Sequence, residues 1–121
     1  MTRHILVVDD HRGVRDALRL VLEAAAFRVT TAADGQQALA RIAAERPDLV
    51  LTDLQMPALS GIELHARLRA RLPALPVVFM SEDPAVARLA AMHSADGYLA
   101  KPFEPDALVA LLALLAPCRA A

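Results

Sequence analysis

The strongest constraint on the fold is an alternation of short apolar runs with longer segments whose apolar residues recur at helical spacing. Three runs are continuously apolar, which is typical of strands buried on both faces, and each ends in polar residues. They are residues 5–8 before Asp9 and Asp10, 49–51 before Thr52 and Asp53, and 77–80 before Ser81. Residues 28–31 are more polar and residues 97–100 form a short run, which indicates two edge strands.

The segments between these runs predict five helices. Val14, Leu18, Val21, Leu22 and Ala25 form one apolar stripe in the first. The second starts near Asp34 and Gly35 and ends before Pro47, which cannot continue a helix. The third opens with a Ser60–Glu63 capping box. The fourth spans residues 84–93, and the fifth runs from Glu104 to Pro117. Strands that alternate with helices give a parallel sheet covered on both faces. We expect one α/β domain over residues 1–121, of the flavodoxin-like class with strand order 2-1-3-4-5, and no output domain.

Composition narrows the class of protein further. The chain is 56% hydrophobic but only 3% aromatic, so its core must consist mainly of Ala, Val, Leu and Ile. A net charge of -1 does not favour nucleic-acid binding. The single cysteine, Cys118, cannot form an internal disulfide, and we expect a cytoplasmic protein. The apolar start is too short for a signal peptide, and no apolar run has the length of a membrane span.

Side chains able to do chemistry follow the strands. In parallel sheets of this order, ligands bind beyond the carboxyl ends of the strands, where Asp9, Asp10, Asp53, Ser81 and Lys101 would gather. Three carboxylates so close would repel one another, and a hard cation such as Mg²⁺ or Mn²⁺ would relieve that repulsion. A carboxylate beside such a cation can attack phosphorus and form an acyl phosphate.

These residues carry a family resemblance over essentially the whole chain. The ordered set comprises Asp9-Asp10, Asp53 to Pro57 with Gly61, Ser81, Tyr98, and Lys101-Pro102-Phe103. It resembles the receiver domains of response regulators in two-component signalling systems. The resemblance implies a phosphoprotein that takes part in a phosphorelay.

The resemblance also implies a role for each matching residue. Asp53 would be the phosphoacceptor that forms an aspartyl phosphate. Asp10 and Asp53 would bind Mg²⁺ (or Mn²⁺) directly, Asp9 would act largely through water, and the backbone carbonyl of Gln55 would complete the protein ligands. Lys101 would pair with the phosphoryl group, and the bond between Lys101 and Pro102 would be cis.

The same resemblance implies a switch and a set of partners. Ser81 would bond a phosphoryl oxygen and move toward it, and Tyr98 would then turn inward. The donor would be a sensor histidine kinase or a histidine phosphotransfer domain, and the chain would catalyse only its own modification. The surface of the fourth helix, fifth strand and fifth helix would change and form a homodimer, without binding nucleic acid or membrane.

Two features leave alternatives open. The fifth helix is apolar nearly all round, which indicates a partner surface or simply a hydrophobic surface helix. Glu82 stands where receivers usually have a small residue, and the segment from Ser81 to Lys101 is about two residues shorter than is common in the family. If Glu82 lies over the site, its charge and bulk would slow both phosphorylation and hydrolysis at Asp53. The alternative function is that of a pseudo-receiver, which acts as a phosphorylation-independent interaction module.

Other readings of the residues fit less well. A phosphatase resembling the haloacid dehalogenases would carry a second Asp where this chain has Gln55. His11 is expected to be a surface residue and not a metal ligand, and His65 and His93 are expected at the surface or at a helix boundary.

Overall fold

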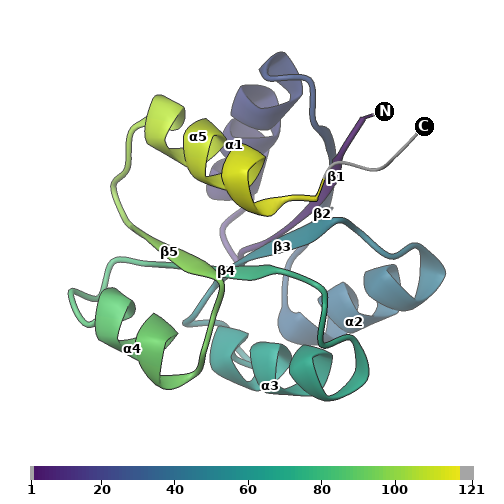
Figure 1. Ribbon diagram of the computed structural model, residues 1–121, viewed down its shortest axis with the longest axis vertical. Helices are drawn as coiled ribbons and strands as arrows, with labels where there is room; N and C mark the ends of the chain where they lie inside the picture. Colours follow the sequence, from purple (N-terminus) through teal and green to yellow (C-terminus); the bar gives the residue numbers. More distant parts are fainter. Residues whose placement is uncertain (1, 118–121) are drawn as a thin grey trace.

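The computed structural model describes residues 2–117, so Cys118 lies outside the described residues. The strands form one parallel sheet in the order β2-β1-β3-β4-β5, and a helix follows each strand (Figure 1). The elements are β1 (His4–Val8), α1 (Arg12–Ala24), β2 (Arg28–Ala32), α2 (Gly35–Ala44), β3 (Leu49–Asp53), α3 (Gly61–Arg71), β4 (Val77–Ser81), α4 (Val86–Met92), β5 (Gly97–Ala100) and α5 (Pro105–Leu115). The expected fold class, strand order and edge strands are confirmed.

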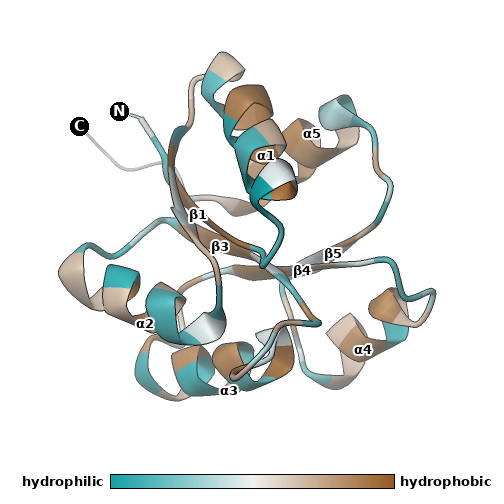
Figure 2. Ribbon diagram, turned by 180° about the vertical axis from the view of Figure 1, so that it is seen from behind, coloured by the Kyte–Doolittle hydropathy of each residue, from teal (hydrophilic) through white to brown (hydrophobic). Residues whose placement is uncertain are grey.

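The sheet separates two hydrophobic clusters, because successive residues of a strand point to opposite faces. Helices α1 and α5 cover one face, and α2, α3 and α4 cover the other (Figure 1). Leu6, Val50 and Phe79 lie in the cluster under α2 to α4, whereas Val7 and Leu51 lie in the cluster under α1 and α5. The central strands are therefore hydrophobic along their length (Figure 2). Burying one such side chain contributes about 1.5–3 kcal/mol.

Helix α4 is shorter than the sequence predicts, with seven residues from Val86 to Met92. The preceding residues form a turn in place of a first helical turn. The Asp83 carboxylate accepts a hydrogen bond from the Ala85 N–H at 2.8 Å, and the Asp83 carbonyl accepts one from the Val86 N–H at 3.0 Å. A local bond between the Asp83 side chain and the backbone competes with helix formation here.

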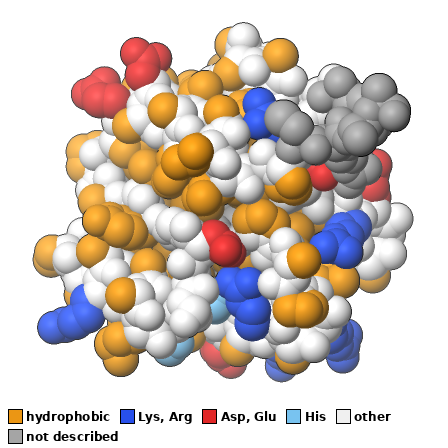
Figure 3. All heavy atoms as spheres, in the orientation of Figure 1, with side chains coloured by type: hydrophobic (Ala, Val, Ile, Leu, Met, Phe, Trp, Pro, Cys, Tyr) orange, Lys and Arg blue, Asp and Glu red, His pale blue; other side chains and the backbone are white. Residues whose placement is uncertain are grey.

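Helix α5 buries only part of its apolar surface. Leu108 and Leu112 are fully buried, but Leu114 is 80% exposed. Hydrophobic side chains accordingly gather on the outer face around α5 (Figure 3). Over the described residues, none of the helices is long and apolar enough to cross a membrane.

His65 is buried in the middle of α3, which corrects the expectation that it lies at the surface or at a helix boundary. Its ring meets the Phe79 ring edge-on with centroids 5.2 Å apart, so the side chain belongs to the core under α3. Arg69 Nη2 lies 3.1 Å from His65 Nε2, which makes that nitrogen the acceptor. Burial, and then the charge of Arg69, lower the pKa of His65 from its ordinary value of 6.5.

The lowered pKa of His65 predicts a loss of stability in acid. Below the ordinary histidine pKa, the unfolded chain binds a proton that the folded chain resists, so the free energy of unfolding should fall as the pH drops. We expect urea denaturation to show that the free energy of unfolding decreases more between pH 8 and pH 5.5 in the wild type than in His65→Gln. Equal losses in the two proteins would show that His65 does not contribute to the pH dependence.

The C-terminal end of α1 contains a residue in the left-handed region. Ala26 has φ 69°, while the Phe27 N–H donates to the Leu22 carbonyl at 3.0 Å. This is the closing geometry in which glycine is normally preferred, since a Cβ strains the left-handed conformation.

Ala26→Gly should therefore stabilise the protein by about 0.5–1 kcal/mol, because relief of strain outweighs the added freedom of the unfolded chain. The matched control is Ala24→Gly in the last residue of α1, which should destabilise the protein by about 0.5–1 kcal/mol. Thermal or urea unfolding of both variants checks the prediction. Destabilisation of similar size in both would contradict it.

Candidate functional site

The parallel sheet brings the ends of four strands to one edge. Asp9 follows β1, Asp53 is the last residue of β3, Ser81 is the last of β4, and Lys101 follows β5. Asp53 in β3 pairs in register with Met80 in β4, so the carboxyl ends of these two strands lie next to each other. The structure thus places the predicted residues along one rim of the sheet.

Lys101 is the cation at the centre of this rim. Its Nζ lies 2.8 Å from Asp9 Oδ2 and 3.6 Å from Asp53 Oδ2, and its side chain is only 13% exposed. Burial lowers the pKa of Lys101, but the hydrogen bond to Asp9 and the charge of Asp53 outweigh burial and raise that pKa overall. Lys101 therefore remains charged. The peptide bond between Lys101 and Pro102 is cis, as the resemblance implies.

Asp53 is a buried carboxylate at the end of a central strand. Burial raises its pKa, Lys101 acts in the opposite direction, and the negative charge of Asp9 adds to the rise. The Gln55 N–H lies 3.4 Å from Asp53 Oδ1, a long contact that leaves most of the carboxylate available. Buried carboxylates are unfavourable unless enough positive charge lies close to them. An added cation would therefore be stabilised next to Asp53 and Asp9.

Asp9 and Asp10 occupy different environments. Asp9 is fully buried, and its Oδ1 accepts a hydrogen bond from the His11 N–H at 2.8 Å. The Asp10 side chain is 30% exposed. Asp9, Asp10, His11 and Asp53 each offer one ligand atom, and these atoms lie within 4.8 Å of one another. This set of mainly hard oxygen donors suits a divalent cation.

The sequence interpretation missed His11 as a member of this group. Its only signal was its position directly after the Asp pair, which does not show where a side chain points. The His11 side chain is 71% exposed, so its expected place at the surface is correct, but its Nδ1 faces the carboxylates.

The loop after Asp53 is held close to the sheet by Gly61. A Cβ at this position would lie 2.2 Å from the Asp53 carbonyl oxygen, a contact that no larger residue could make without moving the backbone. The Gly61 N–H donates to the Leu54 carbonyl at 3.0 Å. The predicted capping box is present, with Ser60 and Glu63 each accepting from the other's N–H. These contacts fix where β3 ends and α3 begins.

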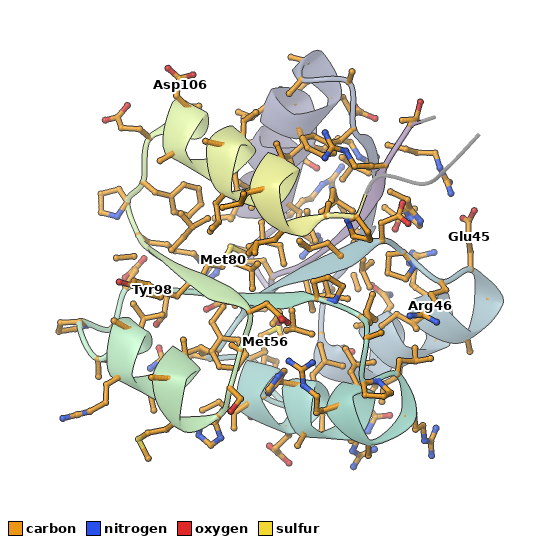
Figure 4. All side chains as sticks on the ribbon, in the orientation of Figure 1. Glu45, Arg46, Met56, Met80, Tyr98 and Asp106 are labelled. Carbon is orange, nitrogen blue, oxygen red and sulfur yellow. The ribbon has the colours of Figure 1, made fainter. Side chains whose placement is uncertain are left out.

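Ser81 and Tyr98 lie on neighbouring strands. Ser81 is buried, and its Oγ accepts a hydrogen bond from the Asp83 N–H at 3.0 Å. Tyr98 is 47% exposed and lies on the edge strand β5 beside α4 (Figure 4). Of the two predicted switch residues, Ser81 is therefore buried and Tyr98 is exposed.

A groove opens next to Lys101, between α1 and the segment that joins β5 to α5. Its volume is about 590 Å³. Most of its lining is apolar, including Val14, Leu18 and Phe103, while Glu82 and Lys101 line its polar part. Glu82 is exposed to solvent and lines the same groove as Lys101.

Comparisons with known proteins agree with this geometry. The family described as response regulator receiver domain matches residues 5–113. The chain is 42% identical over 117 residues to the response regulator MprA of Mycolicibacterium vanbaalenii, which covers 95% of this chain and 51% of that protein. It is 41% identical over 117 residues to MprA of Mycobacterium tuberculosis, with the same coverage. The chain thus spans about half the length of the curated relatives it matches.

Solved structures give the same result. The chemotaxis response regulator CheY4 of Vibrio cholerae has a TM-score of 0.87 at 29% identity, covering 95% of this chain and 99% of that one. The response regulator TrrA of Thermotoga maritima, solved in complex with Mg²⁺-BeF, has a TM-score of 0.86 at 29% identity, covering 94% and 99%. By sequence and by structure, this chain belongs to the family of response regulator receiver domains.

Proposed function

We propose that the chain receives a phosphoryl group on Asp53 and acts as a phosphorylation-controlled switch. The observation that carries the proposal is the position of Asp53 at the rim of the sheet. It lies 3.6 Å from the Lys101 ammonium and within a group of residues able to hold a metal ion. A nucleophilic carboxylate, a fixed cation and a metal site are what a phosphoryl transfer needs.

In the proposed reaction a carboxylate oxygen of Asp53 attacks the phosphorus of a phosphohistidine. The new O–P bond forms as the P–N bond breaks, and the released imidazole nitrogen keeps the electron pair and takes a proton from water. Lys101 stabilises the charge on the transferred group from one side, and Ser81 Oγ donates a hydrogen bond to one of its oxygens. Hydrolysis of the aspartyl phosphate would return the domain to its starting state, so no separate substrate is consumed.

The proposed metal is Mg²⁺, or Mn²⁺ in its place, bound directly by Asp10, Asp53 and the backbone carbonyl of Gln55. When bound, it neutralises charge on the phosphoryl oxygens. Asp9 would act through water, which agrees with its direct bond to Lys101 at 2.8 Å. The related TrrA was solved in complex with Mg²⁺-BeF, which supports Mg²⁺ as the proposed metal of this chain.

The proposed donor is a sensor histidine kinase or a histidine phosphotransfer domain of the cytoplasm. The apolar groove between α1 and the segment that joins β5 to α5 supports a protein donor, because it opens beside Lys101 and a protein that delivers the phosphoryl group would cover it. Movement of Ser81 and inward rotation of Tyr98 would then change the face formed by α4, β5 and α5. The exposed Leu114 supports the use of this face in a homodimer.

Glu82 favours a second candidate function, the phosphorylation-independent interaction module. Its carboxylate lines the same groove as Lys101 and would repel an incoming phosphoryl group. The buried Asp53 and its contact with Lys101 favour the phosphorylated receiver over this candidate.

Intact mass measured after incubation with a small phosphodonor such as acetyl phosphate tests the proposed function. We expect a gain of one phosphoryl group that requires Mg²⁺ or Mn²⁺ and that is absent in Asp53→Asn. No gain in the wild type, under conditions that modify an ordinary receiver, would favour the interaction module instead.

The role of Glu82 is tested by the rate of the same reaction. Glu82→Ala removes a negative charge next to the entering phosphoryl group, so phosphorylation by the small donor should become several-fold faster. Glu23→Ala, which removes an exposed charge from α1, is the matched control and should leave the rate unchanged. Equal rates in wild type and Glu82→Ala would show that Glu82 does not restrict the site.

A further inference from the structure

The His11 side chain contacts the carboxylates at the rim of the sheet and not the hydrophobic core. His11 is the residue before α1, with φ −95° and ψ 115°, and its side chain makes no capping hydrogen bond to that helix. The side chain is 71% exposed, so it belongs to neither hydrophobic cluster. Its orientation toward the rim of the sheet is therefore not explained by packing or by helix capping.

The ring is instead placed against the carboxylates. His11 Nδ1 lies 3.1 Å from Asp10 Oδ1 and 3.3 Å from Asp9 Oδ1. Two ligands held about 2.1 Å from one ion at right angles are about 3 Å apart, so the spacing of His11 Nδ1 and Asp10 Oδ1 matches that of two atoms that bind the same ion. Asp53 completes the group within the 4.8 Å that encloses all four ligand atoms.

We infer that His11 Nδ1 is an additional metal ligand of the receiver site, and that it extends the site from hard cations to borderline transition-metal ions such as Ni²⁺ and Co²⁺. The inference rests on the proposed metal site formed by Asp10 and Asp53. Carboxylate and carbonyl oxygens suit Mg²⁺ and Mn²⁺, whereas an imidazole nitrogen strengthens binding of Co²⁺, Ni²⁺ and Zn²⁺. An ion held through this nitrogen would compete with Mg²⁺ for the carboxylates that the phosphoryl transfer uses.

The test compares the dissociation constants of Ni²⁺ and Mg²⁺ by isothermal titration, using untagged protein with Cys118→Ser so that its single thiol does not bind Ni²⁺. We expect His11→Gln to weaken Ni²⁺ binding tenfold or more and to change Mg²⁺ binding less than twofold. His93→Gln removes an exposed histidine elsewhere and is the matched control, expected to leave both constants unchanged. A second measurement is electron spin-echo spectroscopy of bound Mn²⁺, which should show a nitrogen coupling that disappears only in His11→Gln.

The outcomes distinguish whether His11 is a metal ligand from whether the proposed metal site exists at all. If Mg²⁺ binds and Asp10→Asn abolishes its binding, but His11→Gln leaves the Ni²⁺ constant and the Mn²⁺ spectrum unchanged, the metal site stands. In that case His11 only hydrogen-bonds the carboxylates and the inference is overturned. If neither Mg²⁺ nor Ni²⁺ binds, or if Asp10→Asn has no effect on either, the proposed metal site itself is wrong.

Discussion

The contact of the Lys101 ammonium with two buried carboxylates is the interaction on which the site depends. Lys101 Nζ bonds Asp9 at 2.8 Å and lies 3.6 Å from Asp53. Removing carboxylates from water is unfavourable unless positive charge is close, and one lysine cannot neutralise Asp9, Asp10 and Asp53 together. The raised pKa of Asp53 shows that this compensation is incomplete. A site left short of positive charge in this way is suited to bind a cation.

The hydrophobic core of the sheet offsets the unfavourable free energy of placing these charges close together. Strands β1, β3 and β4 are buried on both faces, and their hydrophobic contacts with five helices hold the charged ends in place. Local features then set the details. Gly61 allows α3 to approach the backbone of Asp53, and the Ser60–Glu63 capping box fixes the start of that helix. The chemical groups therefore lie on the ends of rigid strands rather than on long loops.

The rim divides into a buried half and an exposed half. Asp9, Asp53 and Ser81 are buried, so their positions are set by the core. Asp10, His11 and Glu82 are exposed to solvent. Of the residues that match the receiver motifs, Asp9, Asp53 and Ser81 are buried and Asp10 is exposed, whereas Glu82 departs from the motifs and is exposed. Differences among related receivers in metal or donor preference would accordingly be sought in the exposed half.

The sequence by itself determined the class of fold, the strand order and most of the rim. Continuous apolar runs ending in Asp9, Asp53 and Ser81 are local patterns, and parallel alternation places their ends at one edge. Only the tertiary structure decided which carboxylate Lys101 bonds most closely, that His65 is buried against Phe79, and that His11 faces the carboxylates. It also decided that α4 begins at Val86, where a turn at Asp83 replaces the first helical turn. Each of these results depends on the direction of a side chain or on contacts between segments distant in sequence, and residue type and periodicity do not encode either.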